Sequence, residues 1–152
     1  MAKGTKTIGG GKKSGGYKKE ISGGKKSTDG EKVIWCFEWL DKSGPFSFDL
    51  SRPDFDHREI LEKIIAYSNM TWSEVKRQTH DDGKSKHHML DFSKLGTDAA
   101  ERIRAKKLEQ YTDSIFSFAL QNKLRIIGIR KGQLFYAVWF DPGHQFCPSK
   151  KK

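Results

Sequence analysis

Two side chains near the end of the chain could act on a phosphate group. In the segment KLRIIGIRKGQLFYAVWFDPGH (residues 123–144), Arg125 interrupts an apolar, strand-like pattern and His144 follows an Asp-Pro-Gly turn. A guanidinium fixed in a strand can bind phosphate through two parallel hydrogen bonds. Histidine titrates near neutral pH and suits acid–base chemistry on a phosphodiester. We therefore take Arg125 and His144 as candidate catalytic residues.

Both side chains also have a purely structural interpretation. Strand alternation places Arg125 on the same face as two isoleucines, whereas Arg130 lies at the turn, where it can reach solvent. A guanidinium on an apolar face can be neutralised by an ion pair, and Asp141 and Asp113 are the candidate partners. His144 could simply close its turn. These alternatives stay open at the level of the sequence.

A polar segment, residues 79–96, contains three of the five histidines. Several of its side chains are metal-ligand types, namely His80, Asp81, Asp82, His87 and His88. Standard zinc spacings such as HExxH are missing, so a metal-dependent nuclease is the weaker alternative and we predict no metal and no cofactor. Two interpretations are stronger. One is a solvated loop, and the other is a loop that contacts nucleic-acid phosphates through Lys84, Lys86, His87 and His88.

Positive charge is concentrated at the two ends of the chain. Residues 1–32 carry a net charge of +6 and the last three lysines add +3, which leaves only +1 for residues 33–149. Basic tails on a nearly neutral body indicate a polyanionic partner, because neutralising phosphates releases counterions. A tail that only increases solubility is the alternative. The candidate phosphate contacts in this arm are Lys12, Lys13, Lys18 and Lys19.

Composition divides the chain into three parts. Residues 1–32 are rich in Gly and Lys and nearly free of apolar side chains, so we predict a disordered arm. Residues 33–149 form one domain, and 150–152 are a basic tail. Cys36 and Cys147 lack the spacing of a zinc knuckle or disulfide framework. No apolar stretch is long enough to span a membrane, so we expect a cytoplasmic protein.

Local patterns predict an α+β domain. Apolar alternation indicates strands at 33–41, 46–50, 114–120, 124–130 and 133–140, and helical periodicity indicates helices within 54–70, 71–78 and 97–110. Capping-box pairs, Asp56 with Glu59 and Thr71 with Glu74, mark two of the helix starts. The predicted sheet is small and antiparallel, with the N-terminal strand beside a C-terminal three-strand meander. Two to three helices pack on one of its faces.

The order of these elements, with the segments LRIIGI and FYAVWFDPGH, resembles the RelE/ParE toxin superfamily and within it the RelE- and HigB-type endoribonucleases. In that family pattern a middle strand carries an arginine, here Arg125, and the last strand ends near a histidine or tyrosine, here His144. The resemblance implies metal-independent cleavage of ribosome-bound mRNA, with the 2′-hydroxyl attacking the adjacent phosphorus. It makes Arg125 the phosphate-stabilising group, His144 the acid or base, and Arg130 and Lys131 backbone contacts.

The resemblance also implies partners, namely mRNA on the ribosome and an antitoxin protein. The chain departs from the family pattern in its long basic arm, its 46–50 segment, its longer 79–96 loop and its Phe146-Cys147 pair, where many relatives have a tyrosine. ParE-like members share the fold but act on gyrase, so the fold alone does not fix an activity. The alternative function is a non-catalytic nucleic-acid- or ribosome-binding module that depends on the basic arm.

Overall fold

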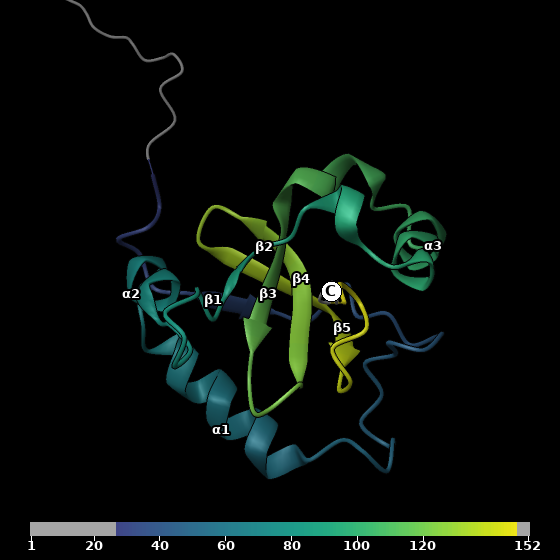
Figure 1. Ribbon diagram of the computed structural model, residues 1–152, viewed down its shortest axis with the longest axis horizontal. Coiled ribbons are helices and arrows are strands. Elements are labelled where there is room, and N and C mark those ends of the chain that lie inside the picture. Colours follow the sequence, from purple (N-terminus) through teal and green to yellow (C-terminus); the bar gives the residue numbers. More distant parts are fainter. Residues whose placement is uncertain (1–26, 149–152) are drawn as a thin grey trace, which may run out of the picture.

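The computed structural model describes residues 27–148, which are built around a five-stranded sheet with the order β1-β5-β4-β3-β2 (Figure 1). The strands are β1 (Ile34–Cys36), β2 (His88–Met89), β3 (Ile115–Ala119), β4 (Arg125–Lys131) and β5 (Leu134–Asp141). The helices are α1 (His57–Ser68), α2 (Trp72–Arg77), α3 (Thr97–Ala105) and the 3-10 helices η1 (Phe92–Lys94) and η2 (Glu109–Ser114). The α+β class and the C-terminal meander are confirmed.

The N-terminal strand differs from the predicted one in length and direction. Only residues 34–36 pair, and they run parallel to β5 rather than antiparallel. Beyond them the chain stays near β5, where the N–H of Asp41 donates to the carbonyl of Val138 at 2.9 Å. The sheet is therefore mixed: β1 and β5 are parallel, whereas the other pairs of strands are antiparallel.

The segment 46–50 is not the strand that its alternation predicts. It forms one backbone hydrogen bond with a strand, in which the N–H of Phe140 donates to the carbonyl of Phe46 at 2.9 Å. Phe46 and Phe48 are both buried, yet they enter different core clusters on opposite sides of the sheet. The pattern identified buried side chains correctly, but the segment crosses the edge of the sheet beside Phe140 of β5 instead of extending it as a strand.

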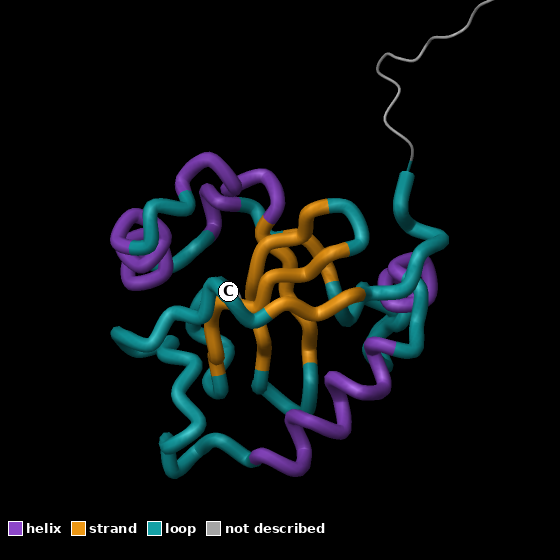
Figure 2. Tube along the Cα trace, turned by 180° about the vertical axis from the view of Figure 1, so that it is seen from behind, coloured by secondary structure: helices purple, strands orange, loops and turns teal. Residues whose placement is uncertain are grey.

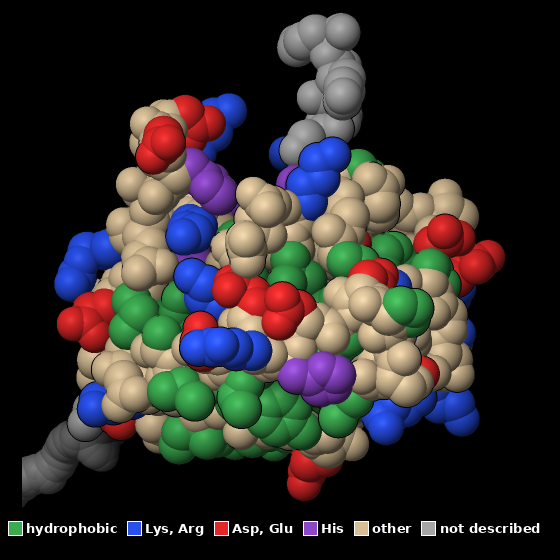
Figure 3. Space-filling view, turned by 90° about the horizontal axis from the view of Figure 1, so that it is seen from below, with side chains coloured by type: hydrophobic (Ala, Val, Ile, Leu, Met, Phe, Trp, Pro, Cys, Tyr) green, Lys and Arg blue, Asp and Glu red, His purple; other side chains and the backbone are tan. Residues whose placement is uncertain are grey.

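The first two helices begin at the predicted caps. The side chain of Asp56 accepts the N–H of Glu59 at 3.0 Å, and Thr71 and Glu74 form a reciprocal capping box with distances of 3.1 and 2.9 Å. The expected apolar stripe of α1 is only partly buried. Its exposed part faces an apolar hollow of about 400 Å³, and hydrophobic side chains gather along one margin of the face seen in Figure 3.

Helices cover both faces of the sheet, so the prediction that they pack on one face is wrong. Trp72 and Val75 of α2 pack with Phe118 in one core cluster, whereas Ile103 of α3 packs with Ile129 in the other. Figure 2 shows the strands between α3 on one side and α1 with α2 on the other. The physical reason is that every residue of β3 is buried, and a sheet apolar on both faces needs a cover on each.

Substitution of Gly128 tests the tight centre of this sheet. Gly128 lies at the β-bulge between β4 and β5, where an added Cβ would overlap the carbonyl oxygen of Tyr136. Because backbone cannot move aside cheaply, we expect Gly128→Ala to lower the free energy of unfolding by about 2–3 kcal/mol. Denaturant unfolding measures this loss. Gly30→Ala is the matched control because open space surrounds Gly30, and equal stability of the two variants would contradict the bulge geometry.

Candidate phosphate-binding site

A polar hollow of about 410 Å³ lies where the 79–90 segment, the start of β4 and the end of the chain meet. Its positively charged or titratable lining side chains are His80, Lys84, Lys86, His88, Arg125 and His144, and its one acidic lining residue is Asp82. The volume lies within the range of ligand sites, which is about 300–1,000 Å³. The two candidate catalytic residues and three of the four predicted loop contacts therefore share one site.

Arg125 opens β4 with a guanidinium that is only partly engaged. Its Nη1 donates to the carbonyls of Asn122 and Leu124 at 2.8 and 3.1 Å. Its Nε and Nη2 make no hydrogen bond or ion pair with any residue in the described part of the chain. Burial lowers the pKa of Arg125, but a guanidinium remains charged at neutral pH. Two donor groups are thus available to an anion.

The ion pair of Arg125 with Asp141 or Asp113, which the sequence left open as an alternative, does not form within residues 27–148. Asp141 lies directly opposite Arg125 in the β4–β5 ladder, but its carboxylate points to the following turn. There it accepts the N–H groups of Gln145 and Phe146, each at 2.9 Å. Because two backbone hydrogen bonds occupy this buried carboxylate, Arg125 keeps its free donors.

The same turn places His144 in the hollow. His144 has a φ of 58°, in the left-handed region that non-glycine residues rarely adopt. The two hydrogen bonds to Asp141 fix the residues just after His144 and so stabilise this backbone conformation. Burial raises the pKa of Asp141, while those N–H groups, the charge of Arg125 and that of His144 when it is protonated oppose the rise. Asp141 is thus a positioning residue for His144.

The two histidines of the hollow have lowered pKa values. For His144 the main cause is burial, followed by the charge of Arg125, and Asp141 acts in the opposite direction. For His88 burial is again the main cause, and Arg125 and His80 add to it. Both imidazoles are therefore mainly neutral at pH 7. A bound phosphate would favour their charged forms and raise both pKa values.

His87 does not face the hollow, and the structure corrects its prediction as a phosphate contact. It is 1% exposed, its Nδ1 accepts the N–H of Ala119 at 3.0 Å, and its Nε2 lies 2.7 Å from Oε1 of Gln78. Burial lowers the pKa of His87 to about 3, so it stays neutral. Because neighbouring residues of a strand point to opposite faces, only one member of the His87–His88 pair can reach the site.

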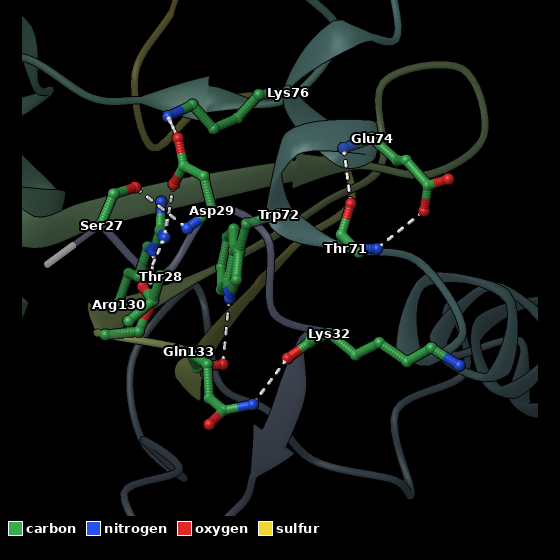
Figure 4. A network of polar contacts seen from close by, with 11 residues as sticks. Ser27, Thr28, Asp29, Lys32, Thr71, Trp72, Glu74, Lys76, Arg130 and Gln133 are labelled. Atoms are coloured by element: carbon green, nitrogen blue, oxygen red, sulfur yellow. Dashed lines mark hydrogen bonds and ion pairs between the residues drawn. The ribbon is translucent and has the colours of Figure 1, made fainter.

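Arg130 and Lys131 lie away from the hollow, at the other end of β4. Arg130 donates to Asp29 at 2.8 Å and to Thr28 at 3.0 Å, and its guanidinium lies 4.0 Å from the ring centroid of Trp72 (Figure 4). These contacts tie residues 27–32, which the sequence assigns to the arm, to the body of the domain. Arg130 is thus engaged within the protein, and the lysines at positions 12, 13, 18 and 19 lie outside the described residues.

Several lining residues were not predicted as phosphate contacts. Among them are His80, which the sequence offered only as a possible metal ligand, Ser117 of β3 and Cys147 of the segment after β5. Burial raises the pKa of the Cys147 thiol, which argues against a thiolate nucleophile. No group of three or more metal-ligand side chains is arranged to hold an ion among residues 27–148. No helix in this part of the chain is long and apolar enough to cross a membrane.

Comparisons with protein-family models, with curated proteins and with solved structures found no match to this chain. The resemblance to the RelE/ParE superfamily therefore stays a prediction. Fold and geometry define an α+β protein with a cationic, histidine-containing hollow at the end of its sheet.

Titration of the histidines by NMR tests the electrostatics of the site. We expect His144 and His88 to titrate below the ordinary value of about 6.5, and both pKa values to rise when inorganic phosphate is added. Arg125→Gln removes one positive charge, so the pKa of His144 should rise in the absence of phosphate. Arg58→Gln, an exposed change on α1, is the control. An unchanged His144 pKa in Arg125→Gln would show that the two side chains do not interact.

Proposed function

We propose that the protein is a RelE-like toxin, an endoribonuclease that cleaves mRNA by attack of the 2′-hydroxyl on the adjacent phosphorus. One observation carries the proposal. Three segments that are far apart in the sequence bring Arg125, His144 and His88 into one hollow of about 410 Å³. A guanidinium with free donors beside two histidines supplies both requirements of this reaction, charge stabilisation and proton transfer.

Each group has a defined part in the proposed reaction. The free Nε and Nη2 of Arg125 bind the non-bridging phosphate oxygens and stabilise the charge that grows in the transition state. One neutral histidine takes the proton of the 2′-hydroxyl as its oxygen bonds to phosphorus. The other histidine, protonated when phosphate is bound, gives its proton to the departing 5′-oxygen. His144 and His88 share these two roles, and the products are a 2′,3′-cyclic phosphate and a 5′-hydroxyl.

Charge outside the reacting centre supports RNA as the substrate. The chain carries a formal charge of +10, most of it in the N-terminal arm with Lys12, Lys13, Lys18 and Lys19. Lys84 and Lys86 extend the positive charge to the rim of the hollow. Neutralising neighbouring phosphates would draw a strand across the site. The setting on the ribosome, an antitoxin partner and a cytoplasmic location rest on the family resemblance.

The second candidate function is a non-catalytic RNA- or ribosome-binding module. The concentration of charge in the arm favours it, because such an arm can supply affinity without any catalytic group. This alternative predicts steeply salt-dependent binding that is largely lost when residues 1–26 are deleted. The deletion stops before Asp29, whose contacts with Arg130 and Lys76 belong to the folded body.

Cleavage of RNA by the purified protein separates the two functions. We expect cleavage of free or ribosome-bound mRNA that persists in EDTA, and losses of about 10²–10⁴-fold in Arg125→Ala, His144→Ala and His88→Ala. Mass spectrometry of the fragments should show the 2′,3′-cyclic phosphate ends.

His57→Ala is the matched control, because His57 begins α1 and lies outside the polar hollow that contains Arg125. It should cleave like the wild type, and growth should stop on induction of both proteins. Intact mRNA with the wild-type protein, on or off the ribosome, would reject catalysis. Binding that is salt-dependent and needs the arm would then favour the second function.

A further inference from the structure

A cluster of three aromatic rings lies at the opposite end of the sheet from the hollow. Trp39 and Tyr136 are stacked, with ring centroids 4.0 Å apart and an interplanar angle of 16°. Tyr111 lies against Trp39 at 5.4 Å. All three side chains are partly exposed, and they come from the segment after β1, from η2 and from β5. All three pack against the core cluster on this face of the sheet, and each leaves part of its side chain open to solvent.

Positive charge accompanies these rings. The Nζ of Lys131 lies 5.4–5.8 Å from the centroids of all three rings. Lys106 lies nearby, because its Nζ donates to the carbonyl of Leu40 at 3.4 Å. Neither lysine forms an ion pair with a carboxylate of the described residues. Both charges are therefore available to an anionic ligand next to an aromatic surface.

Aromatic rings next to two lysines favour one class of ligand, a nucleotide. A quaternary ammonium compound would suit the rings alone, but Lys131 already occupies the cation position and repels a second cation. A nucleotide suits both features, because its base stacks on an aromatic ring while its phosphate meets a lysine. Double-stranded nucleic acid is excluded because its bases are not free to stack, whereas single-stranded RNA presents them.

We propose that Trp39, Tyr111 and Tyr136, with Lys131, form a stacking site for a base of single-stranded RNA, separate from the Arg125 hollow. Lys131 and Arg125 stand at opposite ends of β4, about 20 Å apart at the usual rise of a strand. The site shares with the proposed function only the assumption that RNA is the partner. It would hold a part of the strand remote from the reacting phosphate.

Tryptophan fluorescence of the full-length chain tests the site with a short oligouridylate as probe. The background is Arg125→Ala, which keeps the RNA intact if the protein cleaves. Stacking of a base on the cluster should quench part of the emission. Trp39→Phe should abolish this quenching with at most a twofold change in affinity, because a ring remains. Tyr111→Ala and Lys131→Gln should each weaken binding about 5- to 100-fold, the effect of losing one stacking or phosphate contact.

Phe92→Ala is the matched control, because Phe92 is an exposed aromatic residue outside the cluster. It should bind like the background protein. Unchanged affinity in Tyr111→Ala and Lys131→Gln would overturn the proposal, as would quenching by tetramethylammonium but not by RNA. If the wild-type protein cleaves no RNA but quenching still needs Trp39, catalysis is rejected and the stacking site is supported. If the wild-type protein cleaves RNA but none of these variants changes quenching or affinity, catalysis is supported and the stacking site is rejected.

Discussion

Burial of the central sheet on both faces is the constraint on which the rest of this structure depends. Each residue of β3 is buried, and α1 with α2 on one side and α3 on the other exclude water from the middle of the strands. A charged side chain can then be accommodated only where a strand begins or ends. Arg125 is the first residue of β4 and Lys131 is the last. The two candidate surfaces consequently lie at opposite ends of one strand.

Two buried aspartates fasten the parts of the chain that complete this arrangement. Asp41 accepts hydrogen bonds from Nε and Nη2 of Arg102 and from Nε1 of Trp139, each at 2.9 Å, and so joins α3 to β5. Burial alone would raise the pKa of Asp41, but these bonds lower it overall. Asp141 performs the corresponding task at the end of β5, where it binds two backbone N–H groups. Each buried charge is satisfied by fixed donors, as a folded interior requires.

Local pattern explains how much of this could be predicted from the sequence. Strand alternation placed Arg125 on the face of Ile127 and Ile129 correctly, and the caps of α1 and α2 follow from short-range side-chain geometry. The sequence could not predict which face of the sheet α3 covers, which of His87 and His88 faces the hollow, or the role of Asp141. Each depends on contacts between distant segments, for which short-range periodicity holds no information.

If the hollow binds an anion as proposed, the lowered pKa values of its histidines link proton uptake to that binding. Its cationic and titratable groups come from three segments, and Arg125 lowers the pKa of both His88 and His144. Burial is the main cause of both lowered pKa values, and the charge of Arg125 adds to it. An entering phosphate reverses the balance, because each histidine then gains a negative neighbour. In the proposed reaction, the group that binds the anion and the groups that transfer protons would be linked in this way. In the proposed reaction, such a site would supply a protonated histidine as the general acid once phosphate is bound.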